Sequence, residues 1–372
     1  MKQKVVIVGG VAGGATAAAR LRRLNEDAEI ILIERGPSIS YANCGLPYYV
    51  GDVIKSRDAL FVQTPKSMKD KFNIDVRVLQ EVTRIDRDAK TVEVRNLEKD
   101  ETYTESYDVL VLSTGSSPLR PPIPGIDADR ILTLWNVADT DRIKESIEKW
   151  NVKTATVVGG GFIGLEMAEN LHSRGIHVTI VEMLDQVMAP LDFEMAQLLH
   201  ENLGQNGVKL HLSDGVSTFE NKEKSVLIHL TSGAQVESEL VILSIGVRPN
   251  SQLAKEAGLE LNARGGVVTD ATLKTSDPNI YAVGDVTQVE DFISKQPTMI
   301  PLAGPANKQG RIAANNIAGS AEEYKGSQGT SVAKVFDLTA ASTGANEKTL
   351  IRQGLVKGKD YETLIINQNS HA

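Results

Sequence analysis

The sequence holds a single cysteine, Cys44, among 372 residues. One thiol cannot close an internal disulfide, and it excludes both two-cysteine redox chemistry and a metal cluster held by thiolates. Without context, a lone cysteine is most often a small hydrophobic core residue, and this interpretation stands beside any reactive one. Since the chain has no disulfide to maintain, we expect a reducing, cytoplasmic setting.

Other features are also scarce. The six histidines show no metal-ligand spacing, so we predict no metal site. Lysine and arginine (40) are outnumbered by aspartate and glutamate (48), and the net charge of -8 argues against nucleic acid or an anionic membrane as the main partner. No stretch is long and apolar enough to span a bilayer. The hydrophobic content of 41% is normal for a soluble chain of two to three domains.

A glycine-rich turn opens the chain. The segment "KVVIVGGVAGGATAAARLRRL" predicts a buried strand, a turn and a helix, because the glycines interrupt the apolar run that a secretion signal would need. A second strand, "EIILIE", ends in Glu34. This order is typical of a dinucleotide site, where glycines admit a pyrophosphate and the acid takes a ribose hydroxyl. The middle glycine of the usual pattern is replaced by Val11.

The same pattern of strand, turn and helix recurs about 150 residues later. Two copies of the pattern are stronger evidence for nucleotide binding than one copy. "ATVVGGGFIGLEMAENLHSRGIHVTIVE" carries the full pattern at Gly159, Gly161 and Gly164, and its second strand ends in Glu182. The alternative is two glycine turns of purely structural use. Together the copies predict an α/β fold with two Rossmann-like dinucleotide-binding domains.

Two further segments fit a protein that binds two nucleotides. "YDVLVLSTGSSPLRPPIPG" predicts a strand over 109–112 that enters a turn at Thr114 and Gly115. "TSDPNIYAVGDV" predicts a strand over 280–283 that ends at Asp285, where an acid can bond a chain of sugar-like hydroxyls. Between them, "LVILSIGVRPN" closes the second nucleotide unit.

With these motifs the chain resembles the FAD- and NAD(P)-dependent pyridine nucleotide-disulfide reductases. It is most similar to their single-cysteine branch, the coenzyme A-disulfide reductases and NADH-dependent CoA-persulfide (polysulfide) reductases. The most specific signature is "SYANCGLPYYVG"; "GGVAGG" and "PLAGPANKQGRIAANNIAG" also fit.

The resemblance implies a glutathione reductase-like fold with the start of an α+β dimerisation domain. The implied parts are an FAD domain in two pieces, 1–118 and 247–322, an NAD domain, 119–246, and a partial dimerisation domain, 323–372. In the family the last domain runs on for many tens of residues. We therefore expect a C-terminally truncated chain, with a homodimer for the full-length protein.

The resemblance also implies the residues that contact FAD: Gly9, Val11, Ala12, Gly14, Glu34, Arg35, Asn43, Thr114, Gly115, Asp285 and Ala303. Those implied for NAD are Gly159, Gly161, Phe162, Ile163, Gly164, Glu166, Glu182 and Gly246. We expect NADH rather than NADPH, because Glu182 would repel a 2′-phosphate. Glu166 is alternatively an ordinary first-turn acid, which the helix dipole favours.

Cys44 is the catalytic residue that the resemblance implies, lying by the flavin and forming a mixed disulfide with coenzyme A. Thr16, Arg20, Arg23, Ser40 and Asn43 are the implied substrate contacts. The alternatives are turn formation for Ser40 and Asn43, and a solvated basic helix face for the other three. The implied reaction passes a hydride from NADH to flavin and reduces CoA disulfide, CoA persulfide or polysulfide; "PLAGPANKQG" favours the persulfide.

Two other functions remain open. The first is an NADH oxidase or peroxidase that cycles Cys44 through sulfenic acid. Those relatives commonly carry a histidine inside the first glycine turn, where this chain has Ala12, which weakens the peroxidase hypothesis. The second is a redox-sensing flavoprotein that binds FAD and NADH but turns over no substrate.

Overall fold

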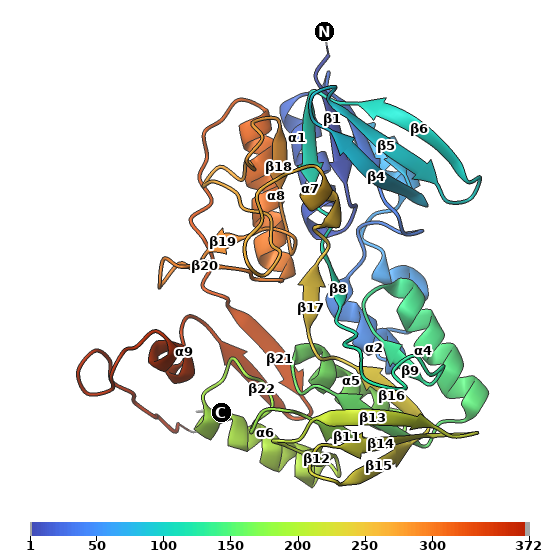
Figure 1. The fold of residues 1–372 in the computed structure, drawn as a ribbon, viewed down its shortest axis with the longest axis vertical. Coiled ribbons are helices and arrows are strands. Elements are labelled where there is room, and N and C mark those ends of the chain that lie inside the picture. The colour runs from blue at the N-terminus through green and yellow to red at the C-terminus, as the bar shows by residue number, and fades with distance from the viewer. Residues whose placement is uncertain (1, 369–372) are drawn as a thin grey trace.

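The computed structural model describes residues 2–368. Two parallel five-stranded sheets stand one above the other in Figure 1, each with helices on one face and an antiparallel meander on the other. This is the α/β fold with two Rossmann-like units that the sequence predicts. No helix of this part of the chain combines the length and the apolar character needed to cross a bilayer.

The first sheet has the strand order β18-β7-β1-β2-β3, and all its pairings are parallel. Its strands are β1 (Lys4–Val8), β2 (Glu29–Ile33), β3 (Asp75–Arg77), β7 (Val109–Leu112) and β18 (Ile280–Ala282). The last strand is one residue shorter than the sequence predicts. Because β18 comes from a distant part of the chain, this unit is assembled from two separate segments.

Alternating side chains of β1 divide the first unit into two cores, as the period of a strand requires. Val5 and Ile7 pack against helices α1 (Ala12–Leu24) and α8 (Ala303–Ile317). Val6 and Val8 pack toward the meander on the other face. The meander consists of β4 (Gln80–Asp86), β5 (Thr91–Asn96) and β6 (Glu101–Ser106).

The second sheet repeats the plan with the order β12-β11-β10-β16-β9. Its strands are β9 (Ile131–Thr133), β10 (Thr154–Val158), β11 (His177–Val181), β12 (Lys209–His211) and β16 (Leu240–Leu243). Helices α4 (Val137–Trp150), α5 (Phe162–Ser173) and α6 (Phe193–Gln205) share one core with it. The other core lies beneath the meander β13 (Val216–Asn221), β14 (Val226–Leu230) and β15 (Gln235–Ser238).

Two antiparallel strands, β8 (Ser116–Pro118) and β17 (Val247–Pro249), carry the chain between the units (Figure 1). The remaining elements are η1 (Asn43–Gly45), α2 (Leu46–Val50), η2 (Arg57–Leu60), α3 (Pro65–Phe72), α7 (Gln252–Glu256), β19 (Val289–Glu290), β20 (Pro297–Thr298), β21 (Ser331–Val335), β22 (Leu338–Ser342) and α9 (Glu347–Arg352). The strands β21 and β22 form a hairpin that packs on α5 and α6. The domain limits inferred above stay a prediction.

Candidate active site

Each parallel sheet presents a glycine turn between its central strand and the following helix. A Cβ added to Gly9 would lie 2.1 Å from the Ser113 carbonyl oxygen, and one added to Gly14 would lie 1.9 Å from the Gly9 oxygen. Gly9 also has a φ of +99°, which side chains disfavour. These two glycines are therefore required by the packing of strand, turn and helix.

The second turn repeats this geometry. A Cβ on Gly159 would lie 2.3 Å from the Ser244 oxygen, and one on Gly164 would lie 2.0 Å from the Gly159 oxygen. Gly161 differs, since a Cβ there would meet nothing within 4 Å. The protein itself does not need this glycine, so the open space beside it fits the close approach of a ligand pyrophosphate.

The acids Glu34 and Glu182 occupy matching positions at the ends of β2 and β11. Glu34 accepts hydrogen bonds from the N–H groups of Gly10 at 2.8 Å and Gly36 at 2.7 Å. Glu182 accepts them from Gly160 at 2.6 Å and Leu184 at 2.8 Å. Each carboxylate is oriented by its own glycine turn and keeps acceptor capacity for a ribose hydroxyl. Burial raises the pKa of Glu34.

Residues from both separate segments of the first unit lie beside the first glycine turn. The Asp285 carboxylate accepts a hydrogen bond from Ser116 Oγ at 2.7 Å, and burial raises its pKa. Gly284 N–H donates to Gln309 Oε1 at 2.7 Å, and Ala303 is the first residue of α8. Sequence reasoning missed Ser116 and Gln309, because only the fold brings them to this place.

These turns, acids and strand ends fit two dinucleotides, and the first turn is the one that we predict to hold FAD. The other residues implied for the cofactors lie around the same turns. Val11 caps α1 and Ala12 begins it, while Phe162 and Ile163 begin α5. Thr114 Oγ1 donates to the Asn250 carbonyl at 2.7 Å, and Gly115 and Gly246, with φ values of +65° and +108°, follow β7 and β16. Arg35 is exposed, and its Nη1 atom lies 3.4 Å from Oε1 of Glu81.

Cys44 lies in the short helical turn η1 and is exposed. The segment before it is joined to the first glycine turn, because Ser40 N–H donates to the Gly10 oxygen at 2.9 Å. Ser40 has a φ of 45°, a strained value for a residue with a side chain. The helix α2 then begins at Leu46 with Gly45 as its N-cap. The lone thiol is thus not a core residue, and it sits near the predicted flavin site.

The neighbours of Cys44 are acidic rather than basic. Partial burial raises the pKa of the thiol, the Glu166 carboxylate raises it further, and a backbone N–H acts in the opposite direction. Glu166 lies in the first turns of α5 and meets the Tyr48 hydroxyl of α2. Its pKa is raised to about 7 by burial and by Glu169, against the Tyr48 hydrogen bond. Sequence reasoning missed Tyr48 as a partner of Glu166.

The residues implied for the substrate lie on two elements. Thr16 Oγ1 donates to Asn307 Oδ1 and Arg20 Nε to Asn315 Oδ1, both at 2.8 Å, so these α1 side chains are oriented by α8. The Arg23 guanidinium lies 5.5 Å from the centre of the Phe72 ring. Asn43 directly precedes the thiol in η1. Substrate contact by any of these residues stays a prediction.

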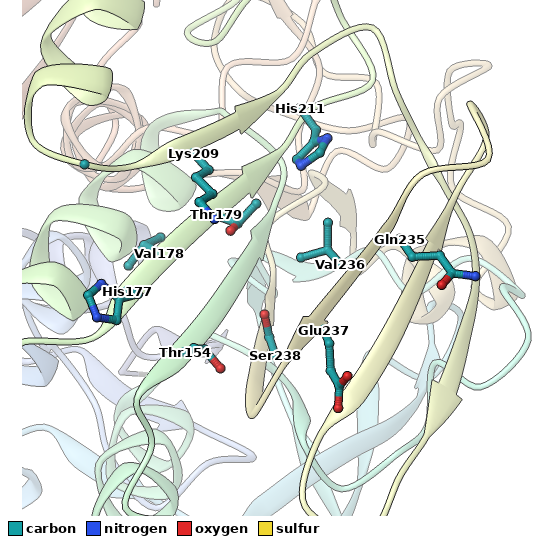
Figure 2. A pocket seen from close by; sticks show the side chains of 11 residues that line it. Thr154, His177, Val178, Thr179, Lys209, His211, Gln235, Val236, Glu237 and Ser238 are labelled. Atoms are coloured by element: carbon teal, nitrogen blue, oxygen red, sulfur yellow. The ribbon is translucent and has the colours of Figure 1, made fainter.

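A separate hollow of about 340 Å³ lies on the second unit, between its parallel sheet and β15. Figure 2 shows Lys209 and His211 of β12 beside Thr179 of β11, with Val236 and Ser238 of β15 opposite. The residues that line it include none of those implied for either cofactor or substrate. It is therefore distinct from the site around Cys44.

Comparison with known proteins agrees with this geometry. Residues 3–310 match the family described as pyridine nucleotide-disulphide oxidoreductase. A coenzyme A disulfide reductase of Staphylococcus aureus (strain JH9) is 34% identical over 370 residues, which are 99% of this chain and 82% of that protein.

Two solved structures are also similar. Reduced Bacillus anthracis CoADR-RHD is 53% identical, with a TM-score of 0.94 over 96% of this chain and 64% of that one. The NAD-dependent persulfide reductase from A. fulgidus is 37% identical, with a TM-score of 0.92 over 95% of this chain and 66% of that one. The present chain thus spans less than two thirds of the length of the Bacillus chain.

Proposed function

Because this chain belongs to the pyridine nucleotide-disulphide oxidoreductases, we propose that it uses NADH to reduce coenzyme A disulfide or CoA persulfide through Cys44. The observation that carries the proposal is the placement of the lone thiol. Cys44 is exposed, and its segment is hydrogen-bonded to the first glycine turn. The relatives named above as coenzyme A disulfide and persulfide reductases support the substrate class.

Both cofactors of the family have places in this chain. The first turn, Glu34 and Asp285 would hold FAD, and the second turn and Glu182 would hold NADH. FAD, when bound, supplies the two-electron carrier between the nicotinamide and the thiol. Arg20 and Arg23 would attract the phosphates of coenzyme A, since arginine binds phosphate oxygens well.

The part played by Cys44 follows from thiol chemistry. The Cys44 thiolate attacks one sulfur of the substrate disulfide, forms a mixed disulfide and releases one coenzyme A thiolate, which takes a proton from solvent. Two electrons from NADH then break the mixed disulfide, which returns the Cys44 thiolate and releases the second thiol. With a persulfide, attack on the outer sulfur would form a Cys44 persulfide and release the coenzyme A thiolate, whereas attack on the coenzyme A sulfur would form the mixed disulfide and release hydrosulfide.

We also infer a cytoplasmic homodimer. A reactive lone thiol needs a reducing compartment to stay free. Apolar side chains are exposed near the C-terminal hairpin and α9, notably Ile351, Val356 and Leu364. Such a patch suits contact with a second subunit.

The test is NADH consumption by the flavin-loaded protein with and without CoA disulfide and CoA persulfide. We expect consumption to depend on the CoA substrate. Consumption that instead follows oxygen or peroxide and ignores CoA would favour the oxidase function. Slow consumption in every condition, with FAD and NADH bound, would favour the sensor.

A further inference from the structure

A loop of the second unit, residues 183–192, directly follows Glu182 and borders the second glycine turn. Its Leu184 N–H donates to the Glu182 carboxylate at 2.8 Å, and its Met188 N–H donates to the Gly160 oxygen at 2.8 Å. Gly160 N–H in turn donates to Glu182 at 2.6 Å. The loop, called the NADH loop below, therefore forms one hydrogen-bonded unit with the turn and the acid that we assign to the coenzyme.

The shape of the NADH loop depends on contacts with other elements. Met188 has a φ of 52°, a value that side chains disfavour, so its backbone is strained. Gln186 carries a polar amide but is only 2% exposed. Strained and buried polar groups persist where the surrounding structure fixes them. The residues that hold this loop from outside therefore help to set the position of the turn and the acid.

Two helices hold the NADH loop. From α6, His200 Nε2 accepts a hydrogen bond from Val187 N–H at 3.1 Å. From the start of α9, the partly buried Lys348 donates through Nζ to Gln186 Oε1 at 2.7 Å and to the Leu191 oxygen at 2.8 Å. Among residues 2–368, no other donor meets that Gln186 oxygen. Without Lys348 a buried amide oxygen would thus be left without its partner.

The start of α9 makes further bonds to the same loop. Asn346 Nδ2 donates to the Pro190 oxygen at 3.1 Å, and Glu347 N–H donates to Asp192 Oδ1 at 2.8 Å. The Asn346 side chain also caps α9, because its Oδ1 accepts a bond from Thr349 N–H at 2.9 Å. The same few residues therefore order the beginning of α9 and brace a loop that lies far from them in the sequence.

Resting on the proposed NADH site, we propose that Lys348 is a positioning residue for NADH, and that the affinity for NADH depends on the docking of α9 against the NADH loop. Lys348 acts through Gln186 and the loop backbone. With this brace in place, the turn and Glu182 are already where a pyrophosphate and a ribose hydroxyl need them. Without it, part of the binding free energy is used to order the loop.

The effect should fall on binding rather than on hydride transfer. The NADH loop is bonded to the acid that would hold the adenosine ribose, whereas the hydride leaves from the nicotinamide at the other end of NADH. An interaction that is equally strong in the ground state and the transition state changes KM and leaves kcat unchanged. Loss of the brace should therefore raise the half-saturating concentration of NADH without slowing flavin reduction at saturation.

The test is anaerobic reduction of the flavin by NADH in flavin-loaded protein carrying Lys348→Met. Methionine keeps much of the side chain's length but cannot donate to Gln186. We expect the half-saturating NADH concentration to rise about tenfold, as for the loss of hydrogen bonds from a charged group. The limiting rate should stay within about twofold. Lys348→Arg keeps the donors and should return the affinity to within about threefold of the native value.

Lys357→Met is the matched control. Lys357 belongs to the same C-terminal segment and pairs with Glu347 at 3.1 Å, but within the described residues it makes no bond to the NADH loop. Its loss removes the same charge, so it tests whether a cation here merely attracts the phosphates of NADH from a distance. Equal affinity losses in the two methionine variants would overturn the proposal. So would an unchanged affinity in Lys348→Met, or a limiting rate that falls as much as the affinity.

A second measurement uses the native protein and does not depend on how the variants fold. If NADH affinity depends on the docking of α9, a ligand at the site must stabilise the docked α9 to the same extent. ADP-ribose carries the adenosine end of NADH without the nicotinamide. It should slow hydrogen exchange at the amides of α9 in the flavin-loaded protein and leave those of α3 unchanged.

Exchange in α9 that does not respond to bound ADP-ribose would contradict the coupling while leaving the NADH site in place. A native protein that binds neither NADH nor ADP-ribose would instead overturn the proposed NADH site, and the role of Lys348 with it.

Discussion

The carboxylate of Glu182 accepts a hydrogen bond from the N–H group of Gly160 at 2.6 Å, while its other oxygen accepts one from Leu184. The acid is thus held at the second glycine turn, where the adenosine ribose of a dinucleotide would lie. The following residues, Met183 to Asp185, are exposed and include no cation.

This arrangement predicts a preference for NADH. A 2′-phosphate would meet the fixed charge of Glu182 and the nearby Asp185, whereas a ribose hydroxyl can donate to Glu182. We expect kcat/KM for NADH to exceed that for NADPH at least about tenfold, which corresponds to about 1.4 kcal/mol. Equal values for the two coenzymes would contradict this assignment.

Substitution by alanine should have different outcomes at Gly161 and at Gly164 of the second turn. Gly164→Ala should destabilise the protein by about 1–3 kcal/mol, because its Cβ would lie 2.0 Å from the Gly159 oxygen. Gly161→Ala should leave the melting temperature almost unchanged but raise the KM for NADH, since its Cβ enters space that only the ligand would fill. Calorimetry and NADH titration separate the two; a destabilised Gly161→Ala would show that this glycine is structural.

Replacing Asp285 should raise the stability of the protein but weaken FAD binding. Its pKa is raised in the folded protein, so its ionised form costs stability above that pKa, and the cost disappears as the pH falls. Asp285→Asn should therefore raise the melting temperature of the flavin-free protein at neutral pH. The same change should weaken FAD binding about tenfold or more, through the loss of a charged acceptor. Ser116→Ala is the control, since it removes the neighbouring hydroxyl and keeps the charge. A lower melting temperature for Asp285→Asn would refute the first part.

The glycine turns and their terminal acids could be predicted from the sequence because they are local. Spacing along one strand, turn and helix predicts the close approach of Gly164 to the Gly159 oxygen, whereas Gly9 is also confined by Ser113 of a later segment.

Contacts between distant segments could not be predicted in this way. Gly310 of α8 is one example, since a Cβ there would lie 2.3 Å from the Gly13 oxygen of α1. The meeting of Tyr48 with Glu166 is another, because it depends on α2 of one segment packing on α5 of the other unit.

Replacing Cys44, the lone thiol, tests the proposed reaction most specifically. Cys44→Ser should keep FAD, because the first glycine turn, Glu34 and Asp285 are unchanged, and the variant should still pass electrons from NADH to the bound flavin. Reduction of CoA disulfide or persulfide should fall below detection, since serine cannot form a mixed disulfide and the sequence holds no second cysteine. The flavin absorbance spectrum serves as the folding control.

The most direct measurement is mass spectrometry of the native protein after exposure to CoA disulfide without NADH. We expect one coenzyme A adduct per chain, located on the peptide that contains Cys44 and removed by NADH in the flavin-loaded protein. An unmodified Cys44 in a protein that nevertheless reduces CoA disulfide would contradict it, because the substrate would then be reduced without the thiol.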